Sequence, residues 1–270
     1  MSIFDIDFTT GLNKLETAIS RFREWYPKDG NTYYGGYSGG KDSDTIMKLA
    51  ELAGTPVEWH YHQGGIDPAE IVYHVRNHPD VIIDRPEKPI LQLIPIKGLP
   101  IRTKRWCCKY VKESGGNGRI VITGVRAGES TRRKHYPIIE SDITKSHKKI
   151  LLRPIIDWTK YDVWEFLKYY SVDYCMLYDE GASGKYKGDG TFQRLGCILC
   201  PMESRGITKI DLDRFPKVAE AWRRAAFRLY EKRKVESPEA VEQWPTFNDM
   251  WYWWLARDKP SVSKLQGILV

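Results

Sequence analysis

The sequence has few cysteines, no long apolar run and no internal repeat. Five cysteines among 270 residues are too few for a disulfide-stapled secreted module. No apolar run approaches the roughly 20 residues that a membrane helix needs, and the mean hydropathy is −0.50. Acidic residues stand near Met1 where a signal peptide carries basic ones, so export is not expected. These absences predict a cytoplasmic protein with no membrane partner.

What is present indicates a globular chain with an uneven charge. Apolar residues make up 41% of the chain and aromatic residues 13%, which is enough for a buried core. The formal net charge is +7, but residues 97–153 hold 15 basic and 4 acidic side chains, a local charge of +11. A basic segment of this kind favours a polyanionic partner, either a nucleic acid or a phosphate-rich small molecule. A solvated surface is the alternative.

Strand-like and helix-like patterns alternate over the first two thirds of the chain. We expect strands at 32–37, 57–62, 81–83, 119–123 and 150–154, and helices at 12–26, 44–53, 68–77, 103–113 and from the capping box Thr159–Asp162 onward. This alternation predicts an α/β fold with an open, doubly wound, mainly parallel sheet, which binds ligands at the carboxyl ends of its strands.

From about Asp211, which we expect to cap a helix, the pattern becomes purely helical and rich in tryptophan. We interpret this part as a helical appendage packed by aromatic rings, with a base-stacking platform as the alternative. The sequence therefore predicts a nucleotide-binding domain at 1–205 and a helical, aromatic-rich extension at 206–270.

One loop between a strand and a helix has the composition of an anion site. In Ser38-Gly-Gly-Lys-Asp-Ser43, Gly39 and Gly40 let backbone N–H groups close around an anion. The following helix N-terminus adds partial positive charge, Ser38 and Ser43 add hydroxyl donors, and Lys41 adds a mobile cation. The spacing is not that of a Walker loop. An ordinary glycine turn is the structural alternative.

This loop resembles the PP-loop of the adenine-nucleotide α-hydrolase-like superfamily, and three further segments resemble its PAPS reductase branch. They are Thr123-Gly-Val-Arg-Ala-Gly-Glu-Ser-Thr-Arg-Arg133, Arg153-Pro-Ile-Ile-Asp-Trp158 and Leu195-Gly-Cys-Ile-Leu-Cys-Pro201. The resemblance implies that Ser38–Ser43 holds the pyrophosphate of ATP. It also implies that Arg126 faces a phosphate. Mg²⁺ prefers hard oxygen ligands, so Asp42 is the residue that we expect to help hold this ion.

Residues of the loop and of the C-terminal segment indicate which branch of the family this sequence resembles. Lys41 and Asp42 resemble the members that consume ATP, because sulfonucleotide reductases usually lack both residues. Those reductases carry a reactive cysteine in a C-terminal Glu-Cys-Gly-Leu-His segment, whereas residues 264–270 here contain none. The motifs are closest to the ATP-using members of the DNA-phosphorothioation type.

Four of the five cysteines form two close pairs, Cys107-Cys108 and Cys197-x-x-Cys200. Four thiolates can bind a metal centre, and a [4Fe–4S] cube accommodates adjacent cysteines better than a single tetrahedral zinc does. The arrangement also resembles the cluster site of APS reductases. Zinc, free thiols or a disulfide remain alternatives, and Cys175 is expected to lie in the core.

Together these features predict an ATP pyrophosphatase of the sulfurtransferase type. Lys41, Asp42 and Arg126 are the candidate catalytic residues, and an acceptor would be adenylylated before iron–sulfur-dependent sulfur transfer. The expected acceptor is a nucleic acid, through DNA phosphorothioation or tRNA thiolation, with a sulfur donor such as a cysteine desulfurase and a possible homodimer. A sulfonucleotide reductase and a metal-stapled nucleic-acid-binding module are the alternatives.

Overall fold

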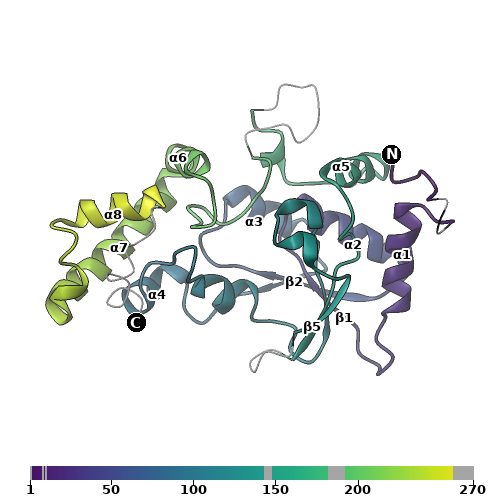
Figure 1. The fold of residues 1–270 in the computed structure, drawn as a ribbon, viewed down its shortest axis with the longest axis horizontal. Coiled ribbons are helices and arrows are strands. Elements are labelled where there is room, and N and C mark those ends of the chain that lie inside the picture. The colour runs from purple at the N-terminus through teal and green to yellow at the C-terminus, as the bar shows by residue number, and fades with distance from the viewer. Residues whose placement is uncertain (1, 8, 10, 143–147, 182–191, 258–270) are drawn as a thin grey trace. The chain divides into compact units, whose positions relative to one another are not determined.

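The computed structural model describes residues 2–7, 9, 11–142, 148–181 and 192–257 (Figure 1). Its chain forms two compact units. The first contains residues 1–62, 69–84 and 114–195, and the second contains 63–68, 85–113 and 196–270. The second unit therefore includes residues 85–113, which the sequence analysis assigned to the nucleotide-binding part. The expected boundary at residue 206 stays a prediction.

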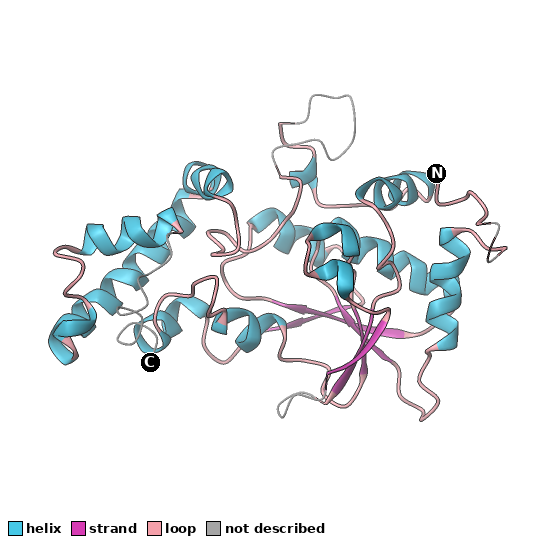
Figure 2. Ribbon diagram, in the orientation of Figure 1, coloured by secondary structure: helices cyan, strands magenta, loops and turns pink. Residues whose placement is uncertain are grey.

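A six-stranded sheet forms the centre of the first unit, with the strand order β3-β2-β1-β4-β6-β5. The strands are β1 Tyr33–Gly36, β2 Val57–His62, β3 Val81–Asp84, β4 Ile120–Ile122, β5 Ile139–Asp142 and β6 Lys149–Leu152. All neighbours pair in parallel except β5 and β6. Figure 2 shows the strands crossing as one twisted sheet. The predicted open, mainly parallel, doubly wound fold is confirmed.

Helices of the first unit connect and cover these strands. They are α1 Lys14–Glu24, α2 Lys41–Ala53, α3 Ala69–Arg76 and α5 Lys160–Tyr169, with short 3-10 turns at Ala127–Glu129, Arg133–His135 and Met176–Tyr178. Helix α2 packs against α1 and α5. The predicted capping box of α5 is confirmed, because Thr159 and Asp162 exchange side-chain-to-backbone hydrogen bonds.

The second unit is helical and packed by aromatic rings. Its elements are α4 Ile90–Lys97, a π-helical turn Cys108–Lys112, α6 Arg205–Arg214, α7 Pro216–Glu236, a 3-10 turn Pro238–Ala240 and α8 Phe247–Ala256. Trp222 of α7 lies against Trp254 of α8, with ring centroids 5.0 Å apart. Trp222, Trp244, Trp251 and Trp254 are all buried. These four rings are core residues, as the aromatic-packing interpretation requires, and are not available for stacking on bases.

Two local expectations were wrong, and two elements were missed. The helix predicted at 103–113 is a short π-helical turn, and helix α4 was not predicted because Pro95 interrupts its pattern. The antiparallel strand β5 was missed because its sequence is mostly polar. Asp211 does not cap a helix but lies inside α6, where its carboxylate accepts a hydrogen bond from the Leu199 N–H at 2.6 Å.

No helix among the described residues combines the length and hydropathy needed to cross a membrane. Residues 264–270, whose lack of cysteine bore on the branch of the family, lie outside the described part of the chain.

Candidate functional site

The predicted anion loop lies where the strand order of the sheet reverses. Strand β1 pairs with β2 on one side and with β4 on the other, so chain connections leave β1 and β4 in opposite directions. Lys41 and Asp42 follow the carboxyl end of β1, and Arg126 follows that of β4. Such a reversal point is where open α/β sheets bind ligands. The fold therefore brings the three predicted catalytic residues to one end of the first unit.

The loop backbone has the form that an anion cradle requires. Gly39 has φ +69°, in the left-handed region that favours glycine. Gly40 precedes the first turn of α2, and its N–H donates to Ser43 Oγ at 3.1 Å. The Ser38 hydroxyl donates to the same Oγ at 3.2 Å. The Ser43 hydroxyl donates to the Gly40 carbonyl at 2.7 Å, so both serines lie at the glycine turn, and an anion bound there would replace these internal hydrogen bonds.

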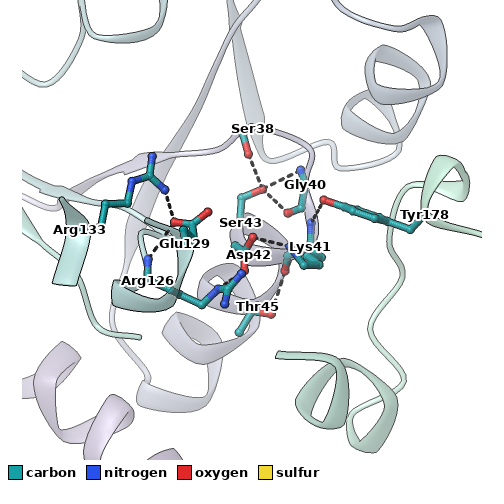
Figure 3. A network of polar contacts seen from close by, with 10 residues as sticks. All are labelled: Ser38, Gly40, Lys41, Asp42, Ser43, Thr45, Arg126, Glu129, Arg133 and Tyr178. Carbon is teal, nitrogen blue, oxygen red and sulfur yellow. Dashed lines mark hydrogen bonds and ion pairs between the residues drawn. The ribbon is translucent and has the colours of Figure 1, made fainter. Parts of the chain in front are cut away.

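Asp42 links the loop to the residues after β4 (Figure 3). Its Oδ2 lies 2.8 Å from Lys41 Nζ, and its Oδ1 lies 2.7 Å from Arg126 Nε. The Lys41 and Arg126 side chains are almost fully buried. Two cations and one carboxylate leave a net positive charge beside a helix N-terminus, which suits a polyphosphate.

Two residues of this site were not predicted. A Cβ on Gly124 would lie 2.8 Å from the backbone oxygen of Asp42, so only glycine lets the segment after β4 approach α2 this closely. Tyr178 accepts a hydrogen bond from the Lys41 backbone N–H at 3.2 Å. The glycine belongs to the quoted 123–133 motif and could have been found there. Tyr178 comes from far along the chain and left no local signal.

The four paired cysteines line one hollow in the second unit. The hollow has a cavity volume of about 20 Å³, and its lining includes Cys107, Cys108, Cys197 and Cys200 together with Ile66, Ile90, Lys112, Pro201 and Trp222. The predicted convergence of the two pairs is therefore observed. Soft sulfur donors between apolar walls fit a soft metal centre.

The thiols of the hollow differ in acidity. The hydrogen bond from Cys107 lowers the pKa of Cys108 to about 7, and Arg105 and Lys112 act in the same direction. The same hydrogen bond and burial raise the pKa of Cys107. Burial raises the pKa of Cys197 and of Cys200. Metal binding releases protons from such thiols and would stabilise them as thiolates.

An acidic and a basic residue beside the cysteines were not predicted. Asp67 is nearly buried and pairs with Lys112 at 2.9 Å. The Cys197 thiol points to the Asp67 carboxylate, with 3.7 Å between sulfur and oxygen. Arg105 also acts on the first cysteine pair, since its charge lowers the pKa of Cys108. Asp67 precedes a helix and gave no sequence signal.

Many basic residues of segment 97–153 already have acidic partners. They pair as Lys112–Asp67, Arg119–Glu58, Arg126–Asp42, Arg133–Glu129 and Arg153–Glu140. Arg132 and Lys134 of this segment are exposed. The positive surface is therefore smaller than the local charge of the sequence indicates.

Comparison with known proteins identifies the family. A family model described as the phosphoadenosine phosphosulfate reductase domain matches residues 33–203, which is more than half of the chain. The chain therefore belongs to the phosphoadenosine phosphosulfate reductase family. This confirms the broad resemblance, whereas membership of the phosphorothioation type stays a prediction.

Individual relatives are distant. An uncharacterized protein of Methanocaldococcus jannaschii is 26% identical over 83% of this chain, and the adenosine 5′-phosphosulfate reductase of Allochromatium vinosum is 28% identical over 48%. A probable FAD synthase of Caenorhabditis elegans is 27% identical over 74%. The matches cover 47%, 46% and 37% of those proteins, so the chain spans about half the length of the curated relatives it matches or less. The crystal structure of a PAPS reductase from Candida auris has a TM-score of 0.47 at 17% identity, covering 70% of this chain and 93% of that chain.

Proposed function

We propose that this chain is an ATP-consuming member of its family that adenylylates an acceptor and releases pyrophosphate. The observation that carries the proposal is the clamp of Asp42 between Lys41 and Arg126 at the reversal point of the sheet. Both cations already face the loop that would hold the pyrophosphate. The relation to a probable FAD synthase, a protein named for the synthesis of an adenine dinucleotide, supports chemistry on an adenine nucleotide.

In this mechanism the chain positions the reactants and neutralises charge. Backbone N–H groups at Gly39 and Gly40 and the hydroxyls of Ser38 and Ser43 would bind the β- and γ-phosphates. Lys41 and Arg126 would form ion pairs with the phosphate oxygens as well as with Asp42. Negative charge grows on these oxygens as pyrophosphate leaves, so the two cations would stabilise the transition state. Asp42 offers hard oxygen donors that fit Mg²⁺, an ion that would neutralise phosphate charge there.

The four-cysteine hollow would hold an iron–sulfur cluster that serves sulfur transfer. Among the described residues, no three of these four sulfurs lie within 4.8 Å of one another, although the Cys107 and Cys108 thiols are hydrogen-bonded. One zinc ion with bonds of about 2.3 Å needs sulfurs only about 3.8 Å apart. The wider spacing favours a larger group such as [4Fe–4S]. The acceptor would be DNA or tRNA, and a cysteine desulfurase is a suitable sulfur donor.

The test is pyrophosphate release from ATP in the presence of candidate acceptors: DNA, tRNA and FMN. Lys41→Ala should lower the rate by about 100-fold or more, because it removes a cation that acts on the leaving group. Lys48→Ala is the matched control, since Lys48 lies on the same helix but pairs with Glu51. Its rate should equal that of the wild type.

A second candidate, the sulfonucleotide reductase, is favoured by the relation to adenosine 5′-phosphosulfate reductases. The same preparation, given APS or PAPS and a thiol reductant, distinguishes the two. Sulfite release without any pyrophosphate release from ATP would contradict the adenylylation proposal and support the reductase. If the protein binds DNA or RNA but shows neither pyrophosphate nor sulfite release, the result would support the non-catalytic nucleic-acid-binding module.

A further inference from the structure

A buried cluster of three metal-ligating residues lies in the first unit and has no part in the proposed function. Asp44 belongs to the first turn of α2, His74 belongs to α3, and His78 follows the end of α3. One ligand atom from each of the three lies within 4.8 Å of the other two. Although His78 lies beyond the helix, its ring lies against that of His74, with the ring centroids 4.9 Å apart.

Two polar atoms of this cluster lack a hydrogen-bond partner. The Asp44 side chain is 0% exposed. Its Oδ1 accepts a hydrogen bond from the Tyr37 hydroxyl at 2.6 Å and lies 3.1 Å from His74 Nε2. Its Oδ2 has no partner, and neither has the buried Nε2 of His78. Burying a carboxylate oxygen and an imidazole nitrogen without partners is costly, and a cation bound between them would remove that cost.

We propose that Asp44, His74 and His78 bind a zinc ion. Two imidazoles and one carboxylate form a donor set that zinc accepts, and such donors suit it better than they suit Mg²⁺ or Ca²⁺. Asp44 and His74 lie on helices α2 and α3, and His78 lies two residues beyond the end of α3. Burial lowers the pKa of His78, which favours the neutral ring that a metal requires.

Tyr37 would orient the carboxylate ligand. Its hydroxyl donates to Asp44 Oδ1, which leaves Oδ2 to the ion, an arrangement typical of the outer shell of metal sites. The ion would join the first turn of α2, which also carries Lys41, to the end of α3. It would also offset the buried negative charge of Asp44 close to the loop assigned to phosphates.

The experiment measures zinc in the full-length protein after growth with zinc supplied. Elemental analysis should find about one zinc per chain that resists gel filtration. X-ray absorption at the zinc edge should show nitrogen and oxygen neighbours at about 2.0–2.1 Å, not sulfur at about 2.3 Å. This readout separates the site from the cysteine hollow and does not depend on ATP turnover.

Two histidine variants complete the test. His78→Gln should raise the zinc Kd by roughly 100-fold or more, because it removes a ligand from the ion. His135→Gln, at an exposed position of the first unit, should retain zinc as the wild type does. Circular dichroism establishes that both variants are folded, and the near-isosteric Asp44→Asn repeats the comparison. The proposal is overturned if folded His78→Gln keeps its zinc, if the zinc neighbours are sulfur, or if the wild type takes up none.

Discussion

Substituting Cys197 and Cys200 together by serine is expected to abolish iron binding. The two residues supply half of the sulfur ligands around the hollow. A serine hydroxyl is a hard, weakly acidic donor that does not replace a thiolate on iron. Purified without oxygen, the wild type should be brown and contain about four irons per chain. The double variant should be colourless with almost no iron, as iron and acid-labile sulfide assays would show.

Cys175→Ala is the matched control for this result. Cys175 is also buried, at 1% exposure, but it belongs to the first unit and does not line the hollow. Its variant should keep the full iron content. A colourless wild type with one sulfur-bound zinc would contradict the cluster and restore the zinc alternative. Iron retained by the double variant would show that the other residues of the hollow are sufficient.

The fold was largely predictable because its signals are local. Strand β2 has the predicted bounds, and the capping box at Thr159 forms as the sequence indicates. The glycine-rich loop predicted the entry into α2, although the helix begins at Lys41 rather than at Asp44. The errors fall where tertiary contacts override local pattern. Strand β5 is polar and exists because β6 offers it an edge.

The sequence indicated the residues of some candidate sites but not those of others. The cysteine pairs and Lys41, Asp42 and Arg126 were found because each belongs to a motif with a known chemical use. The clamp on Asp42 could not be predicted, since it depends on how closely Gly124 lets two segments approach. The Asp44 cluster was missed because its residues come from separate segments. The spacing of His74 and His78 was the one signal in the sequence, and it was not used.

Gly39→Ala is expected to destabilise the first unit and to impair ATP binding. The alanine would take a left-handed conformation, which costs about 1–2 kcal/mol. Its Cβ would also lie 2.8 Å from Cγ2 of Ile71 and 2.9 Å from Cγ2 of Val75, both buried. Overpacking of this kind adds about 1–3 kcal/mol. The free energy of unfolding should therefore fall by about 2–5 kcal/mol, as measured by denaturant unfolding.

Comparison with Gly54→Ala isolates the steric part of the destabilisation expected for Gly39→Ala. Gly54 ends α2 with φ +68°, almost the same as Gly39, but a Cβ there meets nothing within 4 Å. Its variant should lose only the conformational cost of about 1–2 kcal/mol and should bind ATP as the wild type does. The comparison thus holds the backbone strain constant while the contact with α3 changes.

The difference between the two glycine variants tests whether the loop works through its backbone. To relieve the contact with Ile71 and Val75, Gly39→Ala must move the loop, and the N–H groups at Gly39 and Gly40 then leave their places at the start of α2. Displaced donors bind phosphate poorly, so the ATP affinity should fall by roughly 10- to 100-fold, since each hydrogen bond to a charged group contributes about 1.5–3 kcal/mol. Equal ATP affinity in the two variants would mean that Lys41 and Arg126 alone hold the nucleotide and that the glycines serve only the turn.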